Sequence, residues 1–360
     1  MGITLIQTGD TIFNYPPDEP SGLTPNDIIV TASSPTTFRA EFSAGELALV
    51  VVAEGQFSYQ SDVVGLSFGE ASFLTTGTLN KETGTVTRGD GTTSVEITTY
   101  STPKAVEPVT SFDRSLVDLQ REYAGDDIFI GDRDAPGSDS VHGYGGNDRF
   151  VMTYSDEYTE KFRGGEGVDT AVIESESIHW NISTTDSAWD SFAQQSTLDG
   201  YYVSDARYRD TGTFGDNGHV LQLVEVERIE FTDVNVAIDL DGSAGLTAKT
   251  LAAVIGEDGL SNKEYVGIGL QLFDSGQSLA SVCELALTAV GATTNEDVVN
   301  LLYTNLYGEA PTADVAQPFI DALNNGEYTK GILAAAAAEL TDDLGVIDLV
   351  GLAETGIEYV

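Results

Sequence analysis

The amino-acid sequence predicts a multidomain α+β protein. It has a sandwich-like β domain over residues 1–108, a short parallel β-roll with flanking strands over 109–243, and an all-α domain over 244–360. Three observations support this fold class: short β-branched segments come first, a repeat rich in Gly and Asp follows, and the last third has a helical period. The chain has 360 residues, of which 41% are hydrophobic, so domains with separate cores are expected.

Residues 1–108 contain short β-branched or aromatic segments separated by Gly, Ser, Asn or Asp, and no helical period. A small sandwich or barrel-like domain is therefore expected. The expected strands are FRAEFSA, ELALVVVA, GQFSYQ, ASFLTTGTL, GTVTRG and TSVEITTY.

Two motifs in this domain suggest functions that their context does not favour. The segment Gly65–Gly69 (GLSFG) matches the nucleophile elbow of hydrolases, but the elbow requires a helix after it and a strand-like segment follows. We interpret Ser67 as a strand or turn serine. Arg88–Asp90 is the Arg-Gly-Asp tripeptide of integrin ligands, and we interpret it as a hairpin turn between two strands.

Four nine-residue segments in the middle of the chain share a Gly-x-Asp-x-apolar core. They are Glu122–Ile130, Asp134–His142, Gly143–Val151 and Gly164–Val172. The last has the sequence GGEGVDTAV, and the third differs from the same template by Tyr144 in place of the second glycine. Four copies in about fifty residues indicate stacked turns rather than unrelated Gly-Asp loops.

In such a repeat the first six residues turn tightly, aided by glycine, and the last three form a short strand with an inward apolar side chain. Aspartates and backbone carbonyls of neighbouring turns then surround a hard cation, and oxygen ligands without His or Cys favour calcium. Without a cation the stacked aspartates repel one another, so binding and folding are expected to be coupled. The candidate metal ligands are Gly125, Asp127, Gly137, Asp139, Gly143, Gly145, Asn147, Asp148, Gly164, Glu166 and Asp169.

The four turns provide about two complete sites if alternate turns pair. An insertion at Gly131–Arg133 and a polar interruption at Met152–Arg163 leave open whether both sites form.

This repeat resembles that of repeats-in-toxin proteins, which bind calcium in a parallel β-roll. The strand Val226–Asp233 (VERIEFTD) is similar to the strand after the last repeat in such proteins, with a variable loop before it, here Ser183–Leu198. The resemblance implies export from a Gram-negative bacterium by a type I secretion apparatus that reads the C-terminus. The terminal residues Gly356–Val360, an acidic residue followed by apolar ones, are similar to such a signal.

From Ala244 onward, seven segments have a helical period, and most end in Gly or Asn-Gly, a C-cap signal. Asp297–Leu340 is interpreted as a second copy of Ala248–Ala289. This region resembles the duplicated helical domain found at the C-terminus of secreted repeat proteins and surface-layer proteins. Residues 109–121 are expected to be a linker or short helix, and Asp239–Gly242 has the composition of half a calcium loop.

Composition excludes several functions. Lys and Arg total 16 against 58 acidic residues, a formal charge of −42, so general electrostatic binding to nucleic acid or to an anionic membrane is not expected. The single cysteine, Cys283, precludes an intramolecular disulfide and lies among apolar neighbours as an inert thiol. His142, His179 and His219 lie far apart and do not predict a zinc site. No signal peptide and no membrane-spanning segment are visible.

We therefore expect a secreted, calcium-dependent, non-enzymatic protein of the cell surface or matrix, like a surface-layer component. Its expected partners are further copies of the chain through calcium-bridged contacts, the type I secretion apparatus, and a cell-surface glycan as a further candidate. The alternative is a secreted enzyme or glycan-binding module whose active part is the N-terminal β domain.

Overall fold

The computed structural model describes residues 3–8, 29–44, 47–66, 75–87, 93–105, 124–130, 140–152, 159–190, 195–206 and 220–360. The chain divides into two compact units, Met1–Val226 (unit 1) and Glu227–Val360 (unit 2). The structure is mixed, with sheets in unit 1 and helices in unit 2, as a multidomain α+β fold requires. The predicted boundary after residue 108 falls inside unit 1. The linker predicted at 109–121 lies outside the described residues.

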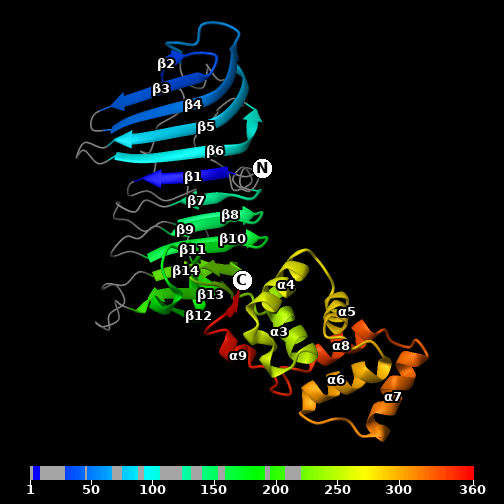
Figure 1. The fold of residues 1–360 in the computed structure, drawn as a ribbon. Coiled ribbons are helices and arrows are strands. Elements are labelled where there is room, and N and C mark those ends of the chain that lie inside the picture. The colour runs from blue at the N-terminus through cyan, green and yellow to red at the C-terminus, as the bar shows by residue number, and fades with distance from the viewer. Residues whose placement is uncertain are drawn as a thin grey trace. The chain divides into compact units, whose positions relative to one another are not determined.

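The first six strands of unit 1 form one antiparallel sheet, which we call the meander: β2 to β6 lie side by side in chain order and β1 pairs with β6 (Figure 1). They are β1 (Ile3–Thr8), β2 (Ile29–Ser33), β3 (Thr37–Ala44), β4 (Leu47–Tyr59), β5 (Thr75–Thr87) and β6 (Thr93–Ala105). The predicted sandwich is therefore wrong for the described strands, which lie side by side in one sheet. Val30, Phe38, Ala53 and Phe57 are buried together in its apolar cluster.

The strands of this meander are longer than predicted because two glycines lie within strands. Gly55 and Gly77 pair with opposite residues of β4 and β5, where a Cβ on Gly55 would collide with the Thr78 carbonyl and one on Gly77 with the Gln56 carbonyl. Glycine here permits a close approach of two backbones, not a turn. The segments expected as separate strands around Gly55 are thus one strand, β4. Ser67 and Arg88–Asp90 lie outside the described residues.

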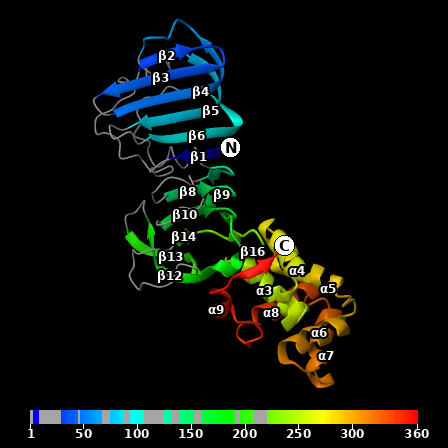
Figure 2. The ribbon, with the colours of Figure 1, turned by 60° about the vertical axis from the view of Figure 1, so that its left-hand side comes forward.

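Two further sets of strands follow in unit 1, with parallel pairing in β1-β7-β9-β11 and β14-β10-β8 and antiparallel pairing of β13 with β12 and β14. The first extends the meander beyond β1 in the order β1-β7-β9-β11, and the second forms another sheet in the order β12-β13-β14-β10-β8 (Figure 2). The strands are β7 (Ile128–Ile130), β8 (Ser140–Gly145), β9 (Arg149–Met152), β10 (Thr159–Glu166), β11 (Thr170–Ile173), β12 (Trp180–Asp190), β13 (Gln195–Asp205) and β14 (Val220–Val224).

The register of these strands has a period of 21 residues, which we call one coil. Ile128 pairs with Arg149, and Arg149 pairs with Thr170. The last strand of the second sheet, β14, comes from farther along the chain and pairs with β10. The segment Met152–Arg163 was predicted to be a polar interruption of the repeats, but its last residues belong to strand β10, which pairs with β8 at the same offset of 21 residues. The predicted loop Ser183–Leu198 is also wrong, because most of it belongs to the β12–β13 hairpin.

Inward apolar side chains fill the space between the two sets of strands. Phe129, Phe150 and Ala171 are fully buried at equivalent positions of the first set, as the repeat predicted. Phe162 of the second set is stacked on Phe150, with 5.6 Å between the ring centroids. The turns between these strands are thus held at a fixed spacing by a packed core.

Unit 2 contains three short strands and seven helices in the described chain. The strands are β15 (Arg228–Glu230), β16 (Asn235–Ala237) and β17 (Ile357–Tyr359), paired antiparallel in that order. The helices are α3 (Ser243–Val254), α4 (Lys263–Asp274), α5 (Leu279–Ala289), α6 (Asn295–Tyr307), α7 (Ala313–Asn324), α8 (Lys330–Glu339) and α9 (Leu349–Leu352), with a 3-10 turn at Glu257–Ser261.

The predicted helices are confirmed, and so are their glycine ends. Gly276, Gly291, Gly308 and Gly326 follow α4 to α7 and have φ values of 83°, 78°, 75° and 71°. Such left-handed residues close a helix most readily when they are glycine. No helix in the described part of the chain is long and apolar enough to cross a membrane.

The order helix–helix–helix occurs twice, as α3-α4-α5 and α6-α7-α8. Buried positions correspond between the copies: Phe273 and Leu323 are each the last but one residue of the middle helix, and Cys283 and Ala334 face the shared core. Cys283 is buried, and this burial raises the pKa of its thiol to about 11. The expectation that Cys283 is buried among apolar neighbours is therefore confirmed.

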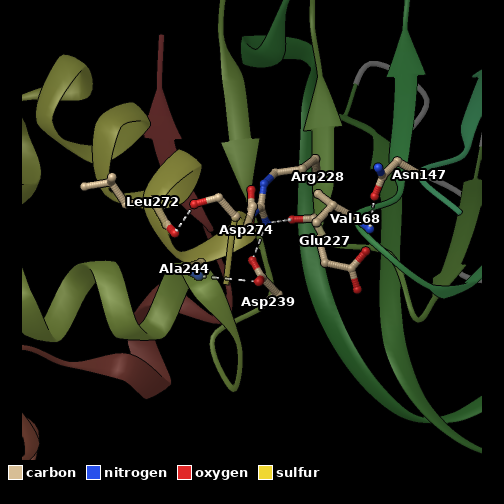
Figure 3. A network of polar contacts seen from close by, with 9 residues as sticks. Asn147, Val168, Glu227, Arg228, Asp239, Ala244, Leu272 and Asp274 are labelled. Atoms are coloured by element: carbon tan, nitrogen blue, oxygen red, sulfur yellow. Dashed lines mark hydrogen bonds and ion pairs between the residues drawn. The ribbon is translucent and has the colours of Figure 1, made fainter. Parts of the chain in front are cut away.

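An ion-pair network ties the strands of unit 2 to its helices (Figure 3). The guanidinium of Arg228 is buried, and one of its terminal nitrogens donates to both carboxylate oxygens of Asp274, at 2.9 and 3.0 Å. It also donates to Asp239, whose other carboxylate oxygen accepts from the N–H of Ala244 at the start of α3. Asp239, in the segment that has the composition of half a calcium loop, thus contacts Arg228 and the backbone of α3.

Candidate metal centre

Three aspartates of unit 1 are stacked one coil apart, and each is joined to the next by a hydrogen bond. The N–H of Asp127 donates to Oδ1 of Asp148 at 2.8 Å, and the N–H of Asp148 donates to Oδ1 of Asp169 at 2.7 Å. All three side chains are at most 1% exposed. Oδ1 of Asp148 and of Asp169 thus fixes the turn before it, and Oδ2 of each lies beside a glycine of its own coil.

Oδ2 of Asp148 lies close to Gly143, in the space that a Cβ on that residue would need. It is buried and has no hydrogen-bond partner among the described residues. The missing Cβ of Gly143 would stand closer than 3.0 Å to this oxygen and to the carbonyl oxygen of Gly164 in the next coil. We call this arrangement of a carboxylate oxygen, a next-coil carbonyl oxygen and an absent Cβ the first cradle.

The same arrangement is repeated one coil later, in a second cradle. A Cβ on Gly164 would lie closer than 3.0 Å to Oδ2 of Asp169 and to the carbonyl oxygen of Glu225. The second cradle therefore has the same kinds of oxygen as the first. Its glycine and its aspartate, Asp169, lie 21 residues after those of the first cradle. Its carbonyl, however, comes from a residue outside the repeats.

The backbone around the cradles requires unusual conformations. Gly146 and Gly167 have φ values of 119° and 139°, and each stacks on the glycine one coil earlier so closely that a Cβ would meet its backbone. Among the described residues, the non-glycine residues with positive φ are Tyr144 (67°) and Glu225 (51°), and both lie beside the cradles. Backbone strain of this kind concentrates at functional sites.

Burial changes the protonation of the cradle carboxylates. Burial, together with repulsion from neighbouring acidic groups, raises the pKa of Asp148 to about 8 and that of Asp169 to about 7. The N–H donated by the preceding aspartate acts in the opposite direction but does not offset the burial. A cation held in either cradle would favour the ionised carboxylate, so proton release is expected to accompany metal binding.

The structure separates the sequence-predicted ligands by role. Asp148, Asp169, Gly143 and Gly164 form the cradles, and Asp127 lies at the start of the stack. Gly137 and Asp139 lie outside the described residues.

Asn147 and Glu166 have positioning contacts near the cradles. Asn147 receives the N–H of Val168 on its side-chain oxygen (Figure 3) and donates its own N–H to Asp126. The carbonyl of Glu166 accepts the N–H of Gly146. Gly145 has only ordinary contacts, the nearest at 3.8 Å.

Two residues that border or support the cradles, Glu225 and Asp126, were not predicted from the sequence. Glu225 has no glycine to mark it, and only the apolar strand Val220–Val224 before it indicates that another coil is placed there. Asp126 was overlooked because the template specifies no residue type at its position, although it accepts the N–H of Asn147 at 2.8 Å. Both act through the fold rather than through the repeat pattern.

The donor set consists of oxygens. No group of three or more His, Cys, Asp or Glu side chains that could hold a metal ion is found in the described chain. Each cradle offers one carboxylate oxygen and one backbone carbonyl oxygen. Such donors fit a hard cation and calcium in particular. His142 is buried beside Tyr144, with 5.8 Å between their rings, and packs within the stack.

Comparison of the sequence with models of protein families finds no match, and a search of curated proteins also finds none.

Proposed function

We propose that this chain is a calcium-dependent extracellular structural protein that takes part in cell-surface or matrix assembly. One observation carries the proposal: a buried carboxylate oxygen and a next-coil carbonyl meet at an absent Cβ, and the arrangement recurs after 21 residues. Such a repeat of oxygen donors is what a calcium-binding β-roll requires. The non-enzymatic role follows from the sequence, in which no catalytic constellation stands out.

Calcium is proposed to act first on folding. Burying an ionised carboxylate in the core is costly, and the raised pKa values of Asp148 and Asp169 express that cost. A bound cation offsets it, so the stack is expected to fold at millimolar extracellular calcium and to open at the sub-micromolar calcium of a cytosol. This dependence suits a chain exported unfolded through a type I secretion apparatus from a Gram-negative bacterium.

Calcium is proposed to act second on assembly. Copies of a chain with a formal charge of −42 repel one another, so lateral contacts need bridging cations or neutralised carboxylates. Weaker surface sites would join protomers after the buried sites have folded each one. A cell-surface glycan is the proposed anchor for such an assembly.

Circular dichroism and light scattering, followed along one calcium titration, test both actions. We expect a folding transition at lower calcium and growth of ordered assemblies at higher calcium. The double variant Asp148→Ala, Asp169→Ala should lose the first transition, whereas Asp62→Ala, in an exposed turn of the same unit, should keep it. A spectrum insensitive to chelator would overturn the calcium role. Monomeric scattering at tens of millimolar calcium would overturn assembly and favour a secreted enzyme or glycan-binding module.

A further inference from the structure

Glu225 closes the second cradle with a backbone conformation that its residue type disfavours. It follows β14 directly, and its φ of 51° lies in the left-handed region. Its carbonyl accepts the N–H of Gly165 at 3.2 Å and also borders the gap above Gly164. In the first cradle the corresponding carbonyl belongs to Gly164, and glycine adopts many conformations at little cost.

The side chain of Glu225 is held by a residue of the neighbouring strand. Arg163, in β10, donates from Nε to Oε2 at 2.8 Å and from a terminal nitrogen to Oε1 at 3.1 Å. Both side chains are partly exposed, at 31% and 45%, so charge attraction alone stabilises the pair weakly. Its two-point geometry nevertheless fixes the orientation of the Glu225 residue beside the cradle.

We infer that the carbonyl of Glu225 is a ligand of the cation in the second cradle, and that Arg163 is the positioning residue that holds this carbonyl in place. The inference rests on the calcium-binding function proposed above. It does not follow from the repeats, because Glu225 lies outside them. Its independent support is the first cradle, where the same donors surround a buried Asp148 oxygen without a hydrogen-bond partner in the described residues.

A consequence is that β14 is ordered by calcium. Its carboxyl end is fixed to the stack by the carbonyl ligand, and its flanks pair with β10 and β13. Loss of the cation from the second cradle should therefore expose the amides of Val220–Val224 to exchange. Amides around the first cradle, one coil away, should show a smaller increase in exchange.

The test uses calcium alone as the ligand, with calorimetry for site affinities and hydrogen exchange for β14. Arg163→Gln should weaken one of the sites about tenfold, because Glu225 then has no support for its left-handed backbone. The double variant Arg163→Gln, Glu225→Gly should bind calcium more tightly than Arg163→Gln alone, because glycine adopts the left-handed conformation without support.

Arg39→Gln is the matched control, because Arg39 forms a comparable exposed pair with Glu41 in the meander of the same unit. It should leave every calcium affinity unchanged. The inference is overturned if Arg163→Gln binds as the wild type does, or if the double variant binds as weakly as Arg163→Gln. A wild-type chain that binds no calcium overturns both the proposed function and this inference. The outcomes named above, with calcium still bound by the wild type, overturn the inference alone.

Discussion

The backbone N–H of Asp127 donates to the side chain of Asp148, which lies 21 residues further along the chain. The same bond recurs from Asp148 to Asp169. One side-chain oxygen thus joins successive coils while the other borders a cradle, so structure and proposed ligand function can be separated by substitution.

Replacing Asp148 by Asn should remove calcium from the first cradle without breaking the stack. The amide oxygen can still accept the N–H of Asp127, but the charge that binds the cation is lost. We expect the calcium stoichiometry measured by calorimetry to fall by one. Stability in chelator at pH 8 should not fall, because a buried carboxylate has been removed. Asp62→Asn is the control, and unchanged stoichiometry in Asp148→Asn would contradict the assignment.

Gly143 and Gly145 should differ sharply when replaced by alanine. A Cβ at Gly143 would occupy the first cradle, whereas one at Gly145 meets its nearest neighbour at 3.8 Å. Gly143→Ala should destabilise unit 1 by about 1–3 kcal/mol and remove one calcium site. Gly145→Ala should do neither. Both tryptophans lie in β12, so tryptophan fluorescence in a urea titration reports the stability of unit 1. Equal effects at the two glycines would contradict the cradle geometry.

In chelator, unit 1 should lose stability as the pH rises. The folded-state pKa values of about 8 for Asp148 and about 7 for Asp169 exceed the ordinary value of 3.8. Their contribution to stability is therefore present below pH 4 and is lost as the pH rises to 8. Because each pKa unit corresponds to about 1.4 kcal/mol, a loss of several kcal/mol is expected.

Saturating calcium should remove this pH dependence, since the bound ion stabilises the ionised carboxylates. Urea titrations at pH 5 and pH 8, with chelator and with calcium, measure both effects. A chelated protein equally stable at the two pH values would show that the aspartates titrate normally.

Removing the buried arginine of unit 2 should be costly. Arg228→Met leaves Asp239 and Asp274 without their shared partner, and a loss of about 3–5 kcal/mol is expected. The labelling rate of the buried Cys283 thiol under native conditions reports opening of this unit. Arg39→Met, which breaks an exposed pair, should cost less than about 1 kcal/mol and leave that rate unchanged. A similarly small effect of Arg228→Met would contradict the importance of the network.

The helices of unit 2 could be predicted from the sequence because their signals are local. Caps such as Thr294, which forms a reciprocal pair with Asp297, and the glycines after each helix lie within a few residues of the ends they set. The strands of unit 1 were less predictable. Glycine at position 55 indicates a turn by residue type, and only pairing with β5 shows that it permits close contact between strands.

The aspartates of the candidate site were identified by their spacing, but their partners were not. The nine-residue template describes one turn, whereas the structure repeats every 21 residues and pairs each aspartate with a carbonyl of the next coil. Which residue supplies that carbonyl depends on strand register. Glu225 could not be found from its type, since an acidic residue in a left-handed conformation is stabilised by a contact, with Arg163, that is distant in sequence.

The 21-residue offset between stacked aspartates makes the coil an interchangeable module. Segment 146–166 begins and ends at equivalent points of successive coils, so its excision would join matching backbones and shorten the stack by one cradle. Duplicating it would lengthen the stack by one cradle, with each hydrogen bond between aspartates reproduced. The number of cradles in a molecule of this architecture is thereby a property of its length, and can be changed one cradle at a time.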